Sequence, residues 1–299
     1  METTEARRKG EWLELRVSRT PESAHAARLT LLAAGELPGK WLNRLYAAGG
    51  IRVGEGCIGL RVFADSELSA EPLYGRAAAA AGTLVPILHE DDYCLVLDKP
   101  AGMAVHPSGP AHGGTLDEQA LRHMLRTGQR VRTRHIHRLD DDTSGPVLYS
   151  KNDLAQWKLD EAMRAKQIDR VYLALAHGRI GPNRGTIDRP IGRDRHHAAR
   201  RRVSSSGDAA TTHYEVVERY ADTTLVRAWL ETGRTHQLRV HFSSLGHPLV
   251  GDALYGGAPR QGIRAQALHG EVLRFPHPWS GARITVCAAS PRWLAALSR

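Results

Sequence analysis

Strand-like and helix-like segments follow one another irregularly along residues 85–299, and this irregularity is the feature that most restricts the fold. Apolar patterns predict strands at 93–97, 146–150, 171–176, 214–220 and 225–231, and helices at 115–125, 153–167 and 235–245. The last two strands form a hairpin pattern around Ala-Asp-Thr, and no regular strand–helix–strand alternation is present. The sequence therefore favours an α+β fold with a mostly antiparallel central sheet, flanked by helices and loops, over a doubly wound parallel fold.

The amino-terminal part predicts a small α/β module. Leu42 and Leu45, followed by Gly49-Gly50, indicate a short helix with a glycine stop, and a strand at 51–53 and a Gly-Glu-Gly turn follow. The stretch at 65–83 is richer in Ala, Glu, Ser and Gly, which indicates a linker. These features predict a module at 1–75, a linker at 76–84 and a larger domain at 85–299.

The charge balance points to a polyanionic partner. The 299 residues include 41 Lys and Arg against 32 Asp and Glu, a net charge of +9, and the isoelectric point is about 9.8. Such a surplus favours nucleic acid first and an anionic membrane surface second.

Several other classes of protein are disfavoured by the sequence. The longest apolar run, at 77–88, is shorter than the roughly 20 residues of a membrane span. The charged first 20 residues lack the apolar stretch of a signal peptide. The three cysteines are far apart and form no C-x-x-C pair, which disfavours a disulfide framework or a cysteine zinc site and favours the reducing cytoplasm.

The surplus positive charge is concentrated in one segment. Residues 179–202 contain eight arginines and only two acids, a net charge of +6. Arginine binds phosphate bidentately and stacks on bases. Pro182, Pro190 and Gly192 make this segment a loop or ribbon rather than a helix. It is either a solvated basic loop or a surface that binds RNA phosphates.

Three consecutive acids, Asp140 to Asp142, stand in the densest functional segment, at 134–152. They follow His137-Arg138 and precede a Thr-Ser-Gly turn, which places an acid at the mouth of a loop. A neighbouring cation can keep such a carboxylate ionised and reactive. On spacing alone, a solvated turn with three acids is the favoured explanation of the pattern.

A second dense segment, at 231–256, places Thr232-Gly233-Arg234 at a strand-to-helix junction. We expect Thr235 to cap the following helix, which Gly246 ends. His236 and His241 are five residues apart with no glutamate between them, so the pattern is not that of an H-E-x-x-H zinc helix. Hydrogen-bonding roles for these histidines are favoured over metal ligation.

These segments together resemble the RluA family of RNA pseudouridine synthases. His137-Arg138-Leu139-Asp140, followed by Thr143-Ser144-Gly145, matches its H-R-L-D-x-x-T-S-G signature. Further matches run in family order from about residue 93 to 290, and they are found at Asp98–Pro107, Arg170–Ala174, Leu230–His241, Gly246–Tyr255, Gln266–His269 and Phe275–Pro278. Arg170 replaces a usual lysine, and Asp141-Asp142 makes the loop more acidic than is usual in the family.

The resemblance implies a pseudouridine synthase fold and the isomerisation of uridine in structured RNA, ribosomal RNA first and transfer RNA second, without cofactor or metal. Asp140 is implied as the catalytic carboxylate and Arg234 as its ion-pair partner. Tyr172 is implied to pack against the target base and Leu238 to wall the pocket. Arg138 is implied to enter the RNA stack where the uridine flips out. His137 and the arginines of the basic segment are expected to contact RNA, namely Arg193, Arg200, Arg201 and Arg202.

The amino-terminal module resembles a degenerate S4-type RNA-binding domain. It keeps the helix–strand shape but lacks the usual Ser-Arg at the helix start and the Asn-Gly of the turn. We expect a monomeric cytoplasmic enzyme without a membrane partner. One alternative is an RNA-binding or ribosome-assembly factor on the same scaffold with lost or secondary catalysis. Another is a metal-dependent nuclease that uses Asp140–Asp142, which is disfavoured because consecutive acids point their side chains apart.

Overall fold

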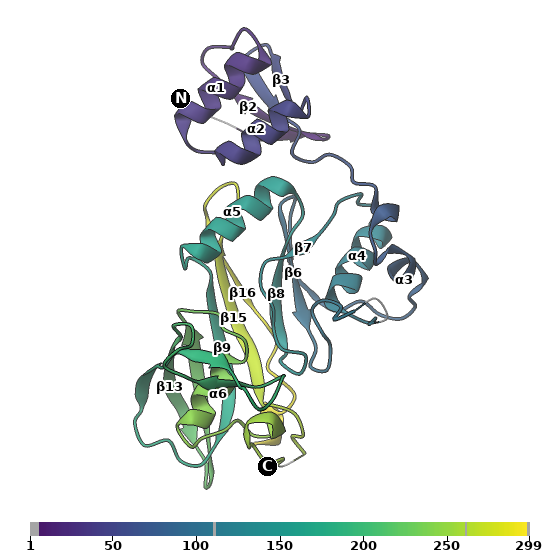
Figure 1. The fold of residues 1–299 in the computed structure, drawn as a ribbon. Helices are drawn as coiled ribbons and strands as arrows, with labels where there is room; N and C mark the ends of the chain where they lie inside the picture. Colours follow the sequence, from purple (N-terminus) through teal and green to yellow (C-terminus); the bar gives the residue numbers. More distant parts are fainter. Residues whose placement is uncertain (1–5, 110–111, 261, 298–299) are drawn as a thin grey trace.

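The computed structural model describes residues 6–109, 112–260 and 262–297 (Figure 1). The first five residues of the expected module and the last two of the expected larger domain therefore lie outside the described residues. Within the described residues, every strand pair in the sheets is antiparallel. Helices cover parts of the sheets, so the expected α+β class is confirmed.

A four-stranded sheet and two helices form the amino-terminal module. Its elements are β1 (Ala6–Lys9), β2 (Trp12–Arg16), α1 (Ala24–Ala34), α2 (Gly39–Ala47), β3 (Ile51–Gly54) and β4 (Cys57–Leu60), with sheet order β1-β2-β4-β3. The helix and strand expected around Leu42 and 51–53 are α2 and β3. Apolar residues of the module pack against Leu154 and Ala155 of helix α5 (Asp153–Arg164). The Arg44 guanidinium also binds the Asp153 carboxylate at 2.7 Å, so the module is docked on the rest of the chain.

The segment expected as a linker includes part of a packed helix. After the short helix η1 (Leu68–Ala70), helix α3 (Tyr74–Ala79) packs against helix α4 (Leu116–Arg126). Ala77 is buried in the largest hydrophobic core. Ala77 therefore belongs to a packed helix rather than to a flexible connection, whereas Ala78 and Ala79 are exposed.

Helix α4 begins as the capping pattern predicts. Thr115 is its N-cap, and its hydroxyl accepts the Glu118 backbone N–H at 3.4 Å. The Glu118 carboxylate accepts the Gly114 N–H at 2.7 Å, one residue before the position that a standard capping box uses.

Two antiparallel sheets form the larger part of the chain. One has the order β5-β6-β8-β7 and consists of Ile87–Glu90, Cys94–Lys99, Gly145–Ser150 and Arg134–His135. The other has the order β10-β13-β14-β9-β15-β16 and consists of Arg184–Asp188, Thr211–Arg219, Thr223–Leu230, Asp169–His177, Leu268–Pro276 and Arg283–Cys287. The expected 214–220 and 225–231 hairpin is β13–β14.

The two sheets approach each other closely beside the Thr-Ser-Gly turn. A parallel bridge joins Ser144 to His269. Gly145 has a φ of +124°, and a Cβ there would lie 2.5 Å from the Gly270 carbonyl oxygen. Only glycine satisfies both the backbone conformation and this contact. The glycine therefore fixes the turn that carries Asp140 onto the second sheet.

The basic segment forms a small β-ribbon of β11 (Ile191–Arg193) and β12 (Arg201–Val203). The ribbon lies beside helix α6 (Gln237–Ser244). The expectation of a loop or ribbon is confirmed. Two short helices, η2 (Ala253–Tyr255) and η3 (Leu294–Ala296), complete the described elements. None of the described helices has the length and apolar content needed to cross a membrane.

Candidate active site

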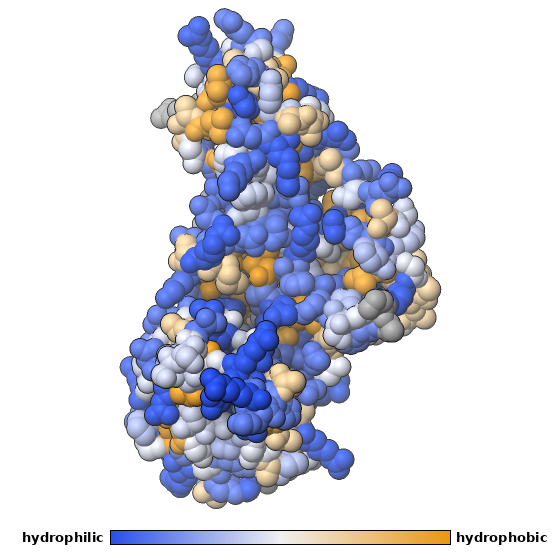
Figure 2. Space-filling view, in the orientation of Figure 1, coloured by the Kyte–Doolittle hydropathy of each residue, from blue (hydrophilic) through white to orange (hydrophobic). Residues whose placement is uncertain are grey.

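A cleft of about 1070 Å³ brings the two motif segments together. Its walls include Arg138, Asp140, Arg234, His236 and Arg239, which lie far apart in the sequence. Figure 2 shows the most hydrophilic side chains of this face gathered in its lower half, over the elements drawn in green in Figure 1. The cleft is therefore polar and rich in charged groups, in contrast to a typical apolar ligand pocket.

The buried Lys99 side chain anchors the loop that carries Asp140. The Lys99 ammonium is fully buried and donates to the Asp141 carbonyl at 2.6 Å and to the carbonyls of Pro100 and Met103. Burial lowers the pKa of Lys99 to about 8, although the Asp141 charge opposes this shift. Within the loop, the Thr143 N–H donates to the Asp140 carbonyl at 2.9 Å. Sequence reasoning assigned no role to Lys99, although it lies in the quoted Asp98–Pro107 segment.

Asp140 is held by one arginine on one of its two oxygens. Arg239 Nη1 donates to Asp140 Oδ2 at 2.9 Å. The same guanidinium donates to both oxygens of the buried Asp252, at 2.7 and 2.8 Å. Burial alone would lower the pKa of Arg239, but the Asp252 hydrogen bonds and the Asp140 charge raise it above its usual value. No described residue donates a hydrogen bond to Asp140 Oδ1.

Arg239 takes the place that the sequence gave to Arg234, so that expected ion pair is wrong. Arg234 is exposed, donates to the Ala209 carbonyl at 3.1 Å and lies 3.7 Å from the Asp208 carboxylate. The reason is its position before helix α6, which begins only at Gln237. Arg239 lies within the first turn of that helix, where its side chain reaches into the site.

The cap of helix α6 also differs from the expectation. His236, not Thr235, is the N-cap residue, and no side-chain hydrogen bond caps the helix. His236 has φ 58° and ψ 22°, a left-handed conformation that is uncommon for residues other than glycine. The Gln237 side chain instead accepts the Arg234 N–H at 3.0 Å. The left-handed turn separates the two arginines of the motif, so that only the second faces Asp140.

A narrow inner pocket of about 70 Å³ extends beside Asp140. Tyr172 and Leu238 line it, together with Leu230 and Leu268, and all but Leu230 are buried. Burial raises the pKa of Tyr172, so its hydroxyl keeps its proton at neutral pH. The structure thus places an aromatic ring and an aliphatic wall next to the carboxylate.

The two residues before Leu139 occupy different environments. Arg138 is exposed at the mouth of the cleft, 3.4 Å from the His106 imidazole. His137 is 7% exposed, and its Nε2 accepts the Leu148 N–H at 3.3 Å. Burial lowers the pKa of His137 to about 3, so the imidazole is neutral. The expected RNA contact of His137 is therefore replaced by a role inside the fold.

The arginines of the basic ribbon remain accessible beside the cleft. Arg193, Arg200 and Arg202 are exposed, and Arg201 is half-buried. The Arg200 guanidinium lies 3.8 Å from the Asp194 carboxylate, a weak exposed pair. The ribbon thus offers a cationic edge next to helix α6.

Arg170 is a site residue that sequence reasoning missed. It lines both the cleft and the inner pocket, and its Nε is buried without a hydrogen-bond partner among the described residues. A Cβ on Gly233 would lie 2.9 Å from Arg170 Nη1, so this glycine leaves room for the guanidinium. The signal was present in the Arg170–Ala174 match, where arginine stands for the usual lysine.

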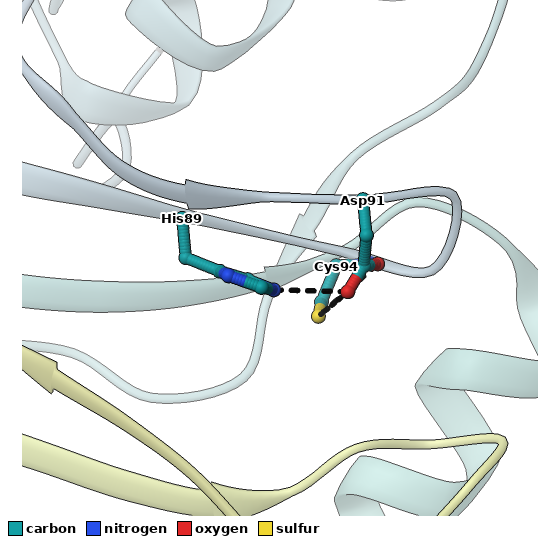
Figure 3. A group of neighbouring side chains, drawn as sticks. All are labelled: His89, Asp91 and Cys94. Carbon is teal, nitrogen blue, oxygen red and sulfur yellow. Dashed lines mark hydrogen bonds and ion pairs between the residues drawn. The ribbon is translucent and has the colours of Figure 1, made fainter.

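A second group of titratable side chains lies on the β5–β6 hairpin (Figure 3). His89, Asp91 and Cys94 place nitrogen, oxygen and sulfur atoms within 4.8 Å of one another, the spacing of possible metal ligands. No such group surrounds Asp140–Asp142 in the described part of the chain.

Hydrogen bonds fill the ligand positions of this second group. Asp91 Oδ1 accepts the N–H groups of Tyr93 and Cys94, at 2.7 and 2.8 Å. Asp91 Oδ2 lies 2.9 Å from His89 Nε2 and 3.3 Å from His277 Nε2. Burial raises the pKa of the Cys94 thiol well above its usual value. The group is therefore organised as a hydrogen-bonded turn with a protonated thiol.

Comparison with known proteins identifies the class to which this fold and site belong. A family model described as RNA pseudouridylate synthase matches residues 92–244. A solved structure, "Human RNA Pseudouridylate Synthase Domain Containing 1", superposes with a TM-score of 0.58 and 29% identity, over 71% of this chain and 86% of that one. The expected pseudouridine synthase fold is confirmed.

Bacterial relatives define the family more closely. "Uncharacterized RNA pseudouridine synthase YhcT" of Bacillus subtilis is 44% identical over 78% of this chain and 76% of its own length. "Ribosomal large subunit pseudouridine synthase D" of Nitrosomonas europaea is 41% identical over 71% of this chain and 63% of its own length. The chain belongs to the RluA family of RNA pseudouridine synthases, and it isomerises uridine to pseudouridine in RNA.

Proposed function

We propose that Asp140 is the catalytic carboxylate and that the substrate is large-subunit ribosomal RNA. The assignment of Asp140 rests on one observation: in the described part of the chain, only one of its two carboxylate oxygens has a hydrogen-bond donor. Arg239 holds Oδ2, while Oδ1 has no donor among the described residues. A charge-assisted hydrogen bond from a guanidinium is strong and fixes the orientation of the carboxylate. Asp140 can then act on the target nucleotide through the second oxygen.

The reaction breaks the bond between ribose C1′ and uracil N1 and forms a bond from C1′ to C5. C5 loses its proton and N1 gains one, so the product is an isomer of the substrate. The uridine must leave its helix to reach the partly buried carboxylate. Arg138, exposed at the cleft mouth, fills the stack that the base vacates. The flipped uracil packs on Tyr172 in the inner pocket, with Leu238 on another wall. Arg170 contributes a guanidinium for the polar edge of the base or its phosphate.

Phosphate contacts outside the pocket come from the basic ribbon. Arg193, Arg200, Arg201 and Arg202 lie on one ribbon beside the cleft, where they bind the backbone of the folded RNA. No cofactor or metal enters this scheme, because the isomerisation is redox-neutral and needs only proton transfer and a carboxylate.

The choice of ribosomal RNA rests on the relatives, several of which are named large-subunit pseudouridine synthases. An enzyme with this substrate works where ribosomes are assembled, so we place it in the cytoplasm. We also propose that it acts as a monomer.

We also propose that residues 1–75 form a degenerate S4-type module, followed by a connection at 76–84 that includes part of α3 and a catalytic domain at 85–299.

Mapping pseudouridines in total RNA from cells with and without the gene tests the substrate. We expect one or a few uridines of large-subunit ribosomal RNA to lose the modification in the deletion strain, and a plasmid copy to restore it. Loss confined to transfer RNA would contradict the proposed substrate. Restoration by a plasmid that encodes Asp140→Asn would contradict the proposed catalytic carboxylate.

A further inference from the structure

A chain of polar contacts runs from the basic ribbon to Asp140 through two side chains. The Arg201 backbone N–H, on β12, donates to the Tyr255 hydroxyl oxygen at 2.9 Å. That hydroxyl lies 2.8 Å from His236 Nδ1. His236 Nε2 in turn lies 3.9 Å from Asp140 Oδ2. Tyr255 is buried, and both it and His236 lie between the ribbon and the carboxylate.

The donors along this chain assign the proton of His236. The Tyr255 oxygen already accepts the Arg201 N–H, and among the described residues the hydroxyl proton has one acceptor within reach, His236 Nδ1. The imidazole proton is therefore on Nε2, which faces Asp140. Burial lowers the pKa of His236; Asp140 and Asp252 oppose this shift, while Arg239 and Arg201 reinforce it. The imidazole is neutral at physiological pH, and its Nε2–H points to the carboxylate.

The backbone of His236 shows that its place is imposed by its surroundings. Its left-handed conformation is unfavourable for a residue with a Cβ. The Tyr255 hydrogen bond and the edge-on contact of the two rings, with centroids 5.7 Å apart, hold it there. Such strain is retained where the surrounding contacts over-determine a conformation, as at functional sites.

We propose that His236 is a positioning residue for Asp140 and that Tyr255 couples it to the RNA-binding ribbon. This inference rests on Asp140 being the catalytic carboxylate. Arg239 and His236 both face Oδ2, which keeps Oδ1 directed at the pocket. At 3.9 Å the His236 contact is longer than a hydrogen bond, and a movement of roughly 1 Å closes it. RNA that presses on the ribbon supplies this movement through Arg201 and Tyr255.

Tyr255→Phe and His236→Asn separate the two links. Phenylalanine keeps the ring on which the Arg239 guanidinium lies, at 5.0 Å, and removes only the hydroxyl. Asparagine tolerates the left-handed conformation but is too short to bridge Tyr255 and Asp140. Tyr214→Phe is the matched control. Tyr214 is equally buried and also packs on α6, through Phe242, but it takes no part in the contacts that link the ribbon to Asp140.

The assay uses total RNA from a strain that lacks the gene, which contains the unmodified target, and enzyme in excess over RNA. We expect Tyr255→Phe and His236→Asn each to slow conversion of the target uridine on the order of 10- to 100-fold, with RNA affinity within about twofold of the native value. His236→Gln, which restores a donor, recovers part of the rate. Tyr214→Phe converts the uridine at the native rate.

The double variant provides the decisive comparison. If Tyr255 acts through His236, Tyr255→Phe has no further effect in the His236→Asn background, so the two losses are not multiplicative. Native rates in both single variants, or multiplicative losses in the double variant, would overturn the proposal. Asp140→Asn measured alongside distinguishes the causes. Full activity in that variant refutes the catalytic role of Asp140, whereas an inactive Asp140→Asn beside native rates for Tyr255→Phe and His236→Asn refutes only the positioning role.

Discussion

Asp91 and Asp140 are both partly buried carboxylates at the start of tight turns, yet their surroundings differ. Two backbone N–H groups, two imidazoles and the Cys94 thiol surround Asp91, so each of its oxygens has three polar neighbours. Asp140 has a single close donor, Arg239, on one oxygen. Burial and hydrogen bonding are thus common to both residues, and the difference lies in the oxygen that is left open.

This difference separates a structural from a reactive carboxylate. A carboxylate has about four acceptor positions, and donors fill them all at Asp91. Asp91 therefore stabilises the β5–β6 turn and its contact with His277, which precedes Trp279 at the edge of the amino-terminal module. At Asp140 the arginine holds the charge while the pocket side stays available.

The largest expected effect is that of Asp140→Asn. We expect uridine isomerisation to fall by a factor on the order of 10³ or more, because the neutral amide replaces the ionised group that acts on the nucleotide. RNA binding should stay close to native, since the phosphate contacts lie on the ribbon. Single-turnover conversion and filter binding on the same preparation measure both quantities. A variant that isomerises at the native rate would remove the distinction between the two carboxylates.

Arg239→Met is expected to affect both folding and activity. It leaves Asp252 buried and Asp140 without its close donor, at a cost of about 3–5 kcal/mol in unfolding free energy. Arg227→Met is the control, because Arg227 also binds carboxylates but is half exposed, so its loss costs about 1 kcal/mol or less. Urea denaturation compares the two variants. Equal stability losses would mean that the Asp140–Arg239–Asp252 cluster is an ordinary surface network.

Acid titration of stability tests the Asp91 turn. Burial would raise the pKa of Asp91, but the His277 contact and the backbone hydrogen bonds lower it below its usual value. Burial would likewise raise the pKa of Glu90, but the hydrogen bonds from Lys151 and Gln129 lower it to about 2. Groups with lowered pKa values in the fold stabilise it at neutral pH, and this contribution disappears as the pH falls below about 5 towards 2.

Asp91→Asn should therefore lower the unfolding free energy at pH 7 by about 1–3 kcal/mol and flatten its decline in acid. Denaturant titrations between pH 7 and pH 3 measure the curve for both proteins. A native-like slope in the variant would show that Asp91 does not contribute the acid dependence.

The smallest expected effect concerns the ribbon. Changing Arg200, Arg201 and Arg202 to glutamine should weaken RNA binding and reduce the slope of log affinity against log salt by about 2 to 3, one for each lost phosphate contact. The control removes the same charge from exposed positions of the amino-terminal module, Arg7, Arg19 and Lys40. Its slope should stay native. A larger decrease of the slope in the control than in the ribbon variant would show that the main RNA contact lies on the amino-terminal module.

Local patterns predicted much of the architecture and the site. The glycine stop after α2, the cap at Thr115 and the apolar runs that form strands depend on neighbouring residues, and each was found. The family resemblance assigned Asp140, Tyr172 and Leu238 to one site, and all three line the inner pocket. These successes reflect interactions that act within a few residues or that the family resemblance carries.

The errors depend on contacts between distant residues. Nothing local shows that His236 adopts a left-handed turn, and this turn decides that Arg239 rather than Arg234 faces Asp140. The Asp252 partner of Arg239 is also visible only in the fold. Ala77 was placed in a linker by composition, although helix packing buries it. His137 similarly looked like an RNA contact because its burial under β8 cannot be read from its neighbours.

The most direct test of the difference between the two carboxylates compares Asp140→Asn with Asp91→Asn in one single-turnover assay, on RNA from the deletion strain, at a temperature where both variants are folded. We predict that the Asp91→Asn variant converts the target uridine at close to the native rate, while the Asp140→Asn variant shows no measurable conversion and still binds the RNA. Native conversion by Asp140→Asn, or loss of conversion in a folded Asp91→Asn variant, would contradict the assignment of Asp140 as the reactive carboxylate and Asp91 as the structural one.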